Sequence, residues 1–200
     1  MMNRLTTMTA GLVLMAGVAF AAPGTVDTLR PGSGQSGAES RDRKDLQIFK
    51  DVASSVERYT RFTIFDDVNA NVKDGVVTLT GRVTMPYKRD DIERRVAELD
   101  GVREVRNRIE TLPVSQFDDE LRYRIARAIY GNSNFWNYAI MPNPPIHIVV
   151  ERGRVTLTGV VASDVDRMLA RSLASGFGAF SVNSELKTDA EVRDALEKSE

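Results

Sequence analysis

The side chains that most often carry out chemistry are scarce in this sequence. It holds one histidine and no cysteine among 200 residues. The missing cysteines exclude disulfides, cysteine nucleophiles, iron–sulfur clusters and zinc–cysteine sites, and one histidine cannot build a multi-histidine metal site. That histidine, His147, stands between Ile146 and Ile148, so it faces the opposite side of a strand from both. Since no nucleophile or second ligand accompanies it, a surface role is favoured over catalysis.

Three acidic clusters are candidates for holding a hard cation. They lie at 66–67, 90–91 and 118–120, and none has the ligand spacing of a calcium loop. The last two stand where carboxylates favour the start of a helix. The sequence also contains no G-x-S-x-G elbow and no phosphate-binding loop. It therefore predicts a non-enzymatic protein without a metal site or a cofactor.

Composition and charge narrow the class of protein further. The 28 acidic and 27 basic residues give a formal charge of -1, which offers no overall attraction to nucleic acid. With 42% hydrophobic and 28% charged residues, the chain can bury apolar cores and stay soluble. Its length fits one ordinary domain or two small ones. A small soluble binding or structural protein is favoured.

Residues 1–21 have the pattern of a cleaved secretory signal. Arg4 precedes a mostly apolar stretch that ends in Ala19-Phe20-Ala21, a typical cleavage site. The alternative, a retained membrane anchor, needs about 20 apolar residues, whereas this core has about 13. We therefore expect cleavage near Ala21 and a periplasmic location. Residues 22–44, rich in Gly and Ser, are predicted to form a flexible leader.

The remaining chain contains an internal repeat. Residues 75–83 read G-V-V-T-L-T-G-R-V and recur as G-R-V-T-L-T-G-V-V at 153–161. The residues before them also correspond: Val68, Ala70 and Val72 match Ile146, Ile148 and Val150. Such self-similarity indicates a duplicated structural unit.

Periodicity predicts the elements of each unit. In the first copy, apolar residues at helical spacing between Leu46 and Val56 are followed by an alternating strand at 68–72. Asp74-Gly75 predicts a tight hairpin turn into a second strand. Gly81 lies in the inward register of that strand, where a helix backbone is expected to approach. A helix from Pro86 and a strand over 102–111 complete the copy.

The second copy repeats the order helix, strand, strand, helix, strand. Its first helix begins at 118–120, and an insertion at 131–145 precedes its first strand. The predicted fold class is α+β, with two small domains that each combine a three-stranded mixed sheet with two helices. A capping-box pattern at 188–191 predicts that the tail, 189–200, is a short helix or is disordered.

The repeat resembles the BON (bacterial OsmY and nodulation) domain in tandem. The features are this element order and the motif V-x-L-x-G-x-V, present at 77–83 and 155–161. The closing G-V-x-x-V-x-N pattern of the family fits 101–107, whereas the second copy places Asn183 one position early. The resemblance implies domains at 45–113 and 117–188. It also implies a bacterial, often periplasmic protein without catalytic residues that binds phospholipid or envelope surfaces in osmotic and other envelope stress.

Three groups of residues are candidates for binding. Alternation places four basic residues on the outer sheet face of the first copy: Lys73, Arg82, Arg106 and Arg108. Two arginines share one side of the last helix of the second copy, Arg167 and Arg171. Aromatic residues stand in the insertion, Phe135, Trp136 and Tyr138. The basic residues suit an acidic membrane surface, but a solvated face, or packing between the domains, is the simpler alternative. The aromatics are a membrane or partner anchor, or a lid on the second copy.

These observations lead to two hypotheses about function. The first is a periplasmic protein that binds anionic phospholipid or another envelope surface, without nucleic acid as a partner and without a membrane span after signal cleavage. The second is a protein-interaction or chaperone-like module that recognises exported proteins through the aromatic insertion.

Overall fold

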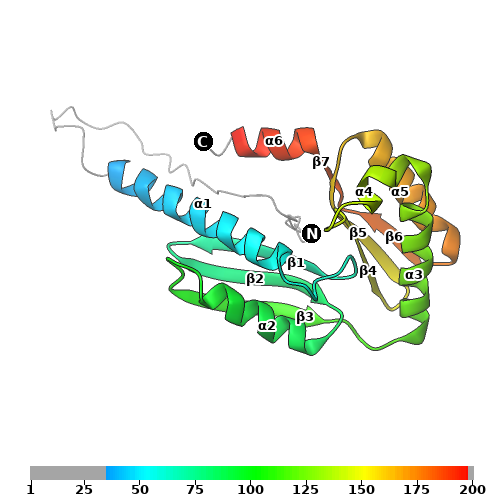
Figure 1. Cartoon of the computed structure of the whole chain (residues 1–200), viewed down its shortest axis with the longest axis horizontal. Helices are drawn as coiled ribbons and strands as arrows, with labels where there is room; N and C mark the ends of the chain where they lie inside the picture. Colours follow the sequence, from blue (N-terminus) through cyan, green and yellow to red (C-terminus); the bar gives the residue numbers. More distant parts are fainter. Residues whose placement is uncertain (1–34, 198–200) are drawn as a thin grey trace, which may run out of the picture.

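The computed structural model describes residues 35–197, which form two α+β units side by side (Figure 1). Domain 1 contains α1 (Gln35–Glu57), β1 (Asp67–Lys73), β2 (Val76–Val83), α2 (Pro86–Ala97) and β3 (Glu104–Thr111). This is the predicted order of elements. The signal peptide predicted at 1–21 lies outside the described residues, as do residues 22–34 of the predicted leader.

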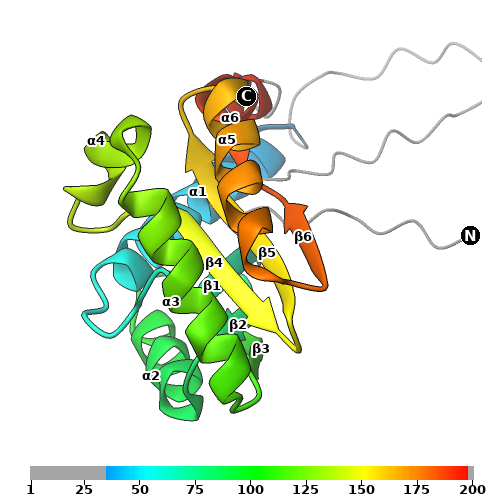
Figure 2. The same cartoon turned by 90° about the vertical axis from the view of Figure 1, so that its right-hand side faces the viewer.

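Domain 2 repeats the order and adds short elements in the insertion and the tail. It contains α3 (Gln116–Tyr130), a 3-10 turn η1 (Ser133–Phe135), α4 (Trp136–Ala139), β4 (Ile146–Glu151), β5 (Arg154–Val161), α5 (Asp164–Ala174), a second 3-10 turn η2 (Ser175–Phe177), β6 (Ser181–Ser184), β7 (Lys187–Thr188) and α6 (Asp189–Glu197). Figure 2 shows α3 and α5 across one face of the second sheet. The α+β repeat is confirmed.

Both sheets are mixed, as predicted. In domain 1, β1 and β2 pair antiparallel and β2 and β3 pair parallel. The strands β4, β5 and β6 repeat this arrangement. The last strand of domain 2 is interrupted, since Arg154 faces Ser181 and Val160 faces Lys187. Because both pairs have the same register, β6 and β7 form one edge strand with a break at residues 185–186.

Helix α1 begins earlier than the sequence pattern indicated. It starts at Gln35, so the predicted flexible leader is helical over 35–44. The prediction gave weight to the Gly and Ser residues before position 38. It undervalued residues 38–44, where Ala, Glu, Arg and Lys favour helix and extend the amphipathic segment toward the N-terminus.

Each domain has its own hydrophobic core between the helices and the inner sheet face. In domain 1, Val77, Leu79 and Val83 of β2 pack with Ile92 and Val96 of α2, and all are buried. In domain 2, equivalent residues of β5 pack with α3 and α5. The alternating apolar residues of the repeat therefore line the two cores, as their period of two requires.

The glycine of the repeated motif is required by a neighbouring strand. Gly81 has a φ of 121°, and a Cβ there would lie 2.1 Å from the carbonyl oxygen of Asp67. Gly159 has a φ of 117°, and its Cβ would lie 1.8 Å from the carbonyl oxygen of Pro145. The expectation of a close helix backbone was therefore wrong. The crowding comes from the chain that enters β1 or β4, and only glycine fits.

Carboxylates on the first helix of each domain bind the hairpin turn. Asp45 accepts hydrogen bonds from the backbone amides of Asp74 and Gly75, at 2.6 and 2.9 Å. Asp118 accepts from Arg152 and Gly153, at 2.8 and 2.7 Å. Part of the acidic cluster at 118–120 is thus structural, and Ser115 caps the same helix.

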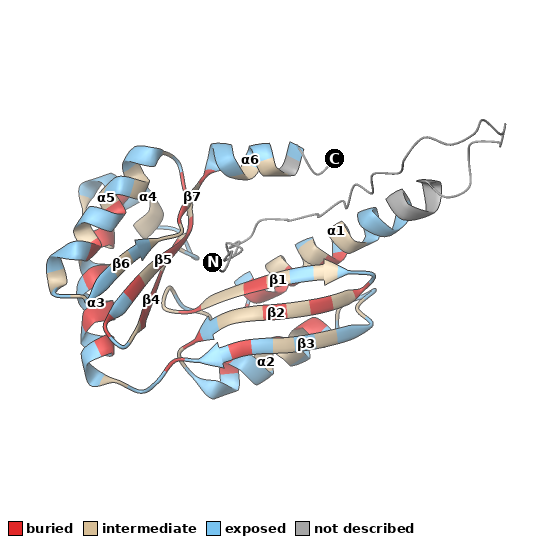
Figure 3. Cartoon of the chain, turned by 180° about the vertical axis from the view of Figure 1, so that it is seen from behind, coloured by how far each residue is buried: buried red, intermediate tan, exposed pale blue. Residues whose placement is uncertain are grey.

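The C-terminal capping box forms as its pattern predicted. Glu191 accepts a hydrogen bond from the Thr188 amide at 2.9 Å, and the Glu191 amide donates to the Thr188 hydroxyl at 3.2 Å. The tail is therefore helical as far as Glu197, and α6 extends back toward the α1 side of domain 1 (Figures 1 and 3).

The segment between α1 and β1 joins the two domains. Ile64 and Phe65 pack against the core of domain 2. The Ile148 amide of β4 donates to the Ile64 carbonyl at 2.7 Å. This backbone contact lies at the free edge of β4, so domain 1 occupies an edge that would otherwise be open.

Candidate functional site

The outer face of the domain 1 sheet is mixed in charge. The strand registers place Lys73, Arg82, Arg106 and Arg108 on this face, as predicted, and all four are exposed. The same registers add three carboxylates that the prediction did not count, Asp67, Glu104 and Glu110. Arg106 binds Glu104 at 2.7 Å. The face is therefore close to neutral rather than strongly basic.

Arg82 lies at the boundary between the domains. Its guanidinium is 3.1 Å from Glu151 of β4 and 3.7 Å from Glu110 of β3. Lys73 and Arg108 make no ion pair within residues 35–197. Of the four basic residues, these two present their charge most freely to solvent.

The two arginines of α5 differ in their surroundings. Arg167 binds both carboxylate oxygens of Glu191 at 2.9 Å and also contacts Asp164 and the Leu186 carbonyl. It thus fastens α6 to α5. Arg171 is exposed, and the described part of the chain offers it no acidic partner.

The three aromatic residues of the insertion have three different roles. Phe135 is fully buried in the domain 2 core. The Tyr138 hydroxyl accepts from the Ala162 amide at 2.8 Å and donates to Asp166 at 3.2 Å. Trp136 is 65% exposed, with Ile140 at 64% and Met141 at 43%. The insertion is both a lid, through Phe135 and Tyr138, and an exposed apolar patch, Trp136–Ile140–Met141, which we call the tryptophan patch.

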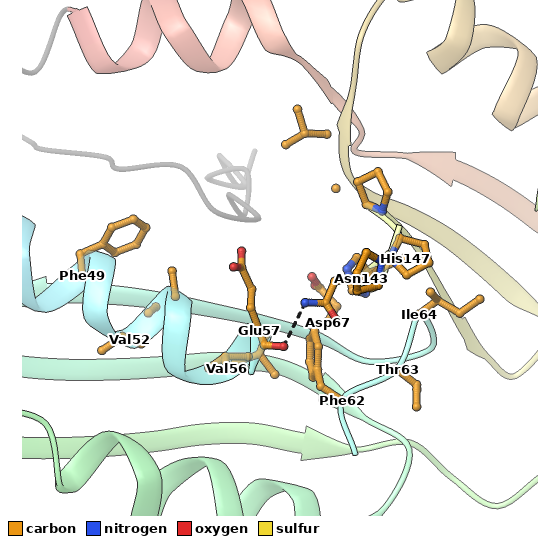
Figure 4. A pocket seen from close by; sticks show the side chains of 18 residues that line it. Phe49, Val52, Val56, Glu57, Phe62, Thr63, Ile64, Asp67, Asn143 and His147 are labelled. Carbon is orange, nitrogen blue, oxygen red and sulfur yellow. Dashed lines mark hydrogen bonds between the residues drawn. The ribbon is translucent and has the colours of Figure 1, made fainter. Parts of the chain in front are cut away.

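A pocket that the sequence did not reveal lies between the domains. It has a volume of about 490 Å³. Its domain 1 walls come from α1, from the α1–β1 segment and from β1, and its domain 2 walls come from the 142–145 loop, β4 and β5. In Figure 4, Phe49 lies at one end, and Glu57, Asp67, Asn143 and His147 lie toward domain 2. The Asn143 side chain donates to the Glu57 carbonyl at 3.1 Å and closes one side.

His147 fastens domain 2 to a buried polar network in domain 1. Its Nδ1 is 2.7 Å from the Asp66 carbonyl oxygen, and since a carbonyl only accepts, Nδ1 carries the proton. The Asp66 carboxylate is fully buried and accepts from Lys88 at 2.6 Å, as well as from Thr63 and Thr84. The prediction of a surface His147 was therefore incomplete, because its ring lies at the domain boundary against Phe62, at 5.4 Å between centroids.

Burial perturbs two titratable groups of the pocket, His147 and Asp67, in opposite directions. It lowers the pKa of His147, and the nearby Asp67 carboxylate opposes this shift. It raises the pKa of the Asp67 carboxyl, opposed by His147 and by the hydrogen bond from Thr158. At neutral pH the imidazole is therefore uncharged. The hydroxyls of Thr158 and Thr63 already donate to carboxylates, so the geometry suits binding rather than nucleophilic chemistry.

The described residues contain no group of three or more His, Cys, Asp or Glu side chains arranged to hold a metal ion. Over the same residues, no helix is both long and apolar enough to span a membrane.

Comparison with known proteins identifies the repeated unit. The BON domain matches residues 44–113 and 118–190, one match in each structural domain. The chain belongs to the BON-domain family. BON domains are associated with envelope and phospholipid-binding proteins, and the family is generally non-enzymatic. No curated protein matched the sequence.

Solved structures similar to this BON protein include two of CdsD, a structural protein of the Type III secretion system of Chlamydia trachomatis. The first is 13% identical, covers 75% of this chain and 97% of that chain, and has a TM-score of 0.27. The second, the CdsD C-terminal domain, is 12% identical, covers 70% and 96%, and has a TM-score of 0.24. These scores are too low to carry a structural inference.

One sequence signal for the pocket existed. The outward positions of the second copy include Val149 and Val160, where the first copy has Asn71 and Arg82. Apolar residues in a solvent-facing register indicate a covered surface. The pattern did not indicate what covered it, because the α1–β1 segment has no periodicity of its own.

Proposed function

We propose that this protein is an exported, non-enzymatic BON protein that binds phospholipid surfaces of the cell envelope through the tryptophan patch. The single observation that carries the proposal is the exposure of Trp136 and Ile140 on a short helix whose neighbours are fixed in the core. Tryptophan favours the membrane–water interface, where its ring contacts both lipid and polar groups.

The geometry of α4 supports an insertion role. Trp136 and Ile140 are four residues apart, so they share one side of the helical turn. The buried Phe135 and the hydrogen-bonded Tyr138 hold the opposite side. Because the patch is already ordered, little conformational entropy is lost when it enters an interface.

Vesicle flotation tests the proposal. Residues 22–200 are the appropriate chain, since the apolar stretch before residue 22 would itself bind lipid. We expect recovery with vesicles and a blue shift of the fluorescence of Trp136, the one tryptophan in the sequence. Trp136→Ala should reduce the partition coefficient at least about tenfold, because burying an aromatic ring in lipid is worth about 1.5–3 kcal/mol.

Tyr123→Ala is the matched control, because Tyr123 is also 65% exposed but lies on α3. Equal losses for Tyr123→Ala and Trp136→Ala would overturn the patch as the lipid contact. Comparing vesicles of anionic phosphatidylglycerol with vesicles of neutral phosphatidylcholine measures how much charge contributes to lipid binding. The substitutions Lys73→Glu, Arg108→Glu and Arg171→Glu should remove the difference between the two. A fluorescence shift with unfolded client proteins and none with either vesicle would favour the protein-interaction function instead.

A further inference from the structure

The pocket between the domains has the chemistry of a ligand site separate from the tryptophan patch. Its volume of about 490 Å³ lies within the range of small-molecule sites, about 300–1,000 Å³. Most of its wall is apolar, including Phe49, Val52 and Ala53 of α1 and Val160 of β5. A few polar groups converge at one end (Figure 4). An apolar body and one polar end therefore describe a complementary ligand.

The polar end contains two carboxyl groups and no Lys or Arg side chain; its one basic side chain is His147, whose pKa is lowered by burial. The lining residues include Glu57 and Asp67 but no Lys or Arg. Within residues 35–197, neither of these carboxylates takes part in an ion pair. Arg82 stands opposite Asp67 in the β1–β2 register, but its guanidinium binds Glu110 and Glu151. Lys187 of β7 pairs beside Val160, yet it does not line the pocket.

The surroundings of the Asp67 carboxylate favour a cationic ligand over an anionic one. Its carboxylate accepts from Thr158 and from Asn69, both at 3.2 Å, and these long contacts leave acceptor capacity on both oxygens. Asp67 is half-buried and its burial raises the pKa of its carboxyl, whereas Glu57 is exposed. A cationic donor would regain a charge-assisted hydrogen bond there, whereas an anion would meet two carboxylates.

We propose that this pocket binds a small amphiphile whose polar end is a primary or substituted ammonium group and whose body is aliphatic or aromatic. The ammonium group lies near Asp67 and Glu57, and the apolar body extends along α1 toward Phe49. Because the two domains each supply one wall, the ligand also fixes their relative orientation and stabilises the folded protein by mass action.

Three probes with the same octyl chain and different polar groups separate the contribution of the charge to binding from that of the apolar body. Octylammonium, octanol and octanoate, each below its micelle concentration, are titrated into residues 22–200 by calorimetry. We expect octylammonium to bind about tenfold more tightly than octanol, because a hydrogen bond to a charged group exceeds a neutral one by about that factor. Octanoate should bind most weakly. If octanoate bound as tightly as octylammonium, the proposal would be overturned. The same would follow if none of the three probes bound.

Variants locate the binding. Ala53→Phe fills the pocket and should abolish octylammonium binding, while Ala97→Phe, at an exposed site on α2, should leave it unchanged.

Asp67→Asn should reduce octylammonium binding to the level of octanol. Glu57→Gln, which disturbs no side-chain hydrogen bond between residues 35 and 197, should reduce it about threefold, and Glu98→Gln should not. Octylammonium binding that survives Ala53→Phe would place the ligand elsewhere and overturn the proposal.

Ligand binding in the pocket is independent of the proposed lipid binding by the tryptophan patch. Trp136→Ala should leave octylammonium binding unchanged, and Ala53→Phe should leave vesicle flotation unchanged. Loss of both activities with either variant would contradict the separation of the two sites.

Discussion

The outer faces of the two sheets differ, although the sheets are built from the same unit. In domain 1 this face is open and carries exposed Asn71 and Lys73 on β1 (Figure 3). In domain 2 the equivalent region of β4 and β5 is covered, with Val149 only 4% exposed and Thr158 only 3%. Domain 1 covers this face of domain 2. In return, domain 2 contacts the Asp67–Arg82 end of the domain 1 face through Thr158 and Glu151 and leaves Asn71 and Lys73 exposed.

This difference indicates how one fold acquires two roles. The motif V-T-L-T-G sets the same backbone in both copies, including the glycine beside a crowded carbonyl. The outward residues then diverge with their surroundings, so Asn71 and Arg82 of domain 1 correspond to Val149 and Val160 of domain 2. The tryptophan patch belongs to the insertion of domain 2. The pocket forms where the insertion and the outer face of domain 2 meet α1, the α1–β1 segment and β1 of domain 1.

The largest loss of stability is expected when the cation buried in domain 1, the Lys88 ammonium group, is removed. Lys88→Met leaves the Asp66 carboxylate without its ion pair and should destabilise the protein by about 3–5 kcal/mol. Denaturant unfolding, followed by circular dichroism and by Trp136 fluorescence, measures the change. The control Lys73→Met, at an exposed position, should change stability by less than about 0.5 kcal/mol. Equal effects would show that the Asp66–Lys88 pair is not structural.

Exchanging outward residues between the domains tests the faces directly. Val149→Asn places a polar amide in a covered position and should cost about 2 kcal/mol. Asn71→Val, the reverse change at the equivalent open position, should alter stability by less than about 0.5 kcal/mol. Thermal unfolding of the two variants gives the comparison, and similar costs would mean that the two faces are equally covered.

Acidification should weaken domain 2 through His147. Because the folded-state pKa of His147 is lowered, the unfolded state binds its proton more tightly, so stability falls as pH drops below the ordinary value of about 6.5. The raised pKa of Asp67 acts in the opposite sense, since protonation of that carboxyl favours the folded state. His147→Asn introduces the residue that domain 1 has at this position, Asn69, and should flatten the profile between about pH 7 and 5. An unchanged decline would exclude His147 as its source.

The smallest change in stability is expected at the surface ion pair between the domains. Arg82→Ala removes the ion pair with Glu151 and should cost less than about 1 kcal/mol, because both groups are partly exposed. The loss should shrink further at high salt. Arg108→Ala on the same face should be neutral, and chemical denaturation at two salt concentrations distinguishes the variants.

Sequence reasoning located the elements of the candidate sites better than their environment. It found the aromatic insertion, but it could not separate the buried Phe135 from the exposed Trp136, since neighbouring residues in a loop have no fixed period. It placed four basic residues correctly on one face but omitted the three carboxylates of the same face, Asp67, Glu104 and Glu110. It missed the pocket, whose walls come from two separate segments of the chain, within residues 49–70 and 142–160.

What the sequence determined by itself is the local unit: two BON domains, their hairpin turns, their apolar inner faces and the capping box of α6. Each depends on residues that are near in the chain or that recur with the period of a helix or strand. Only the tertiary structure decided that Ile64 pairs with Ile148, that His147 contacts the Asp66 carbonyl, and that Glu57 and Asp67 line one pocket. Those contacts join residues of separate units, and no periodicity within either unit specifies how the two surfaces fit together.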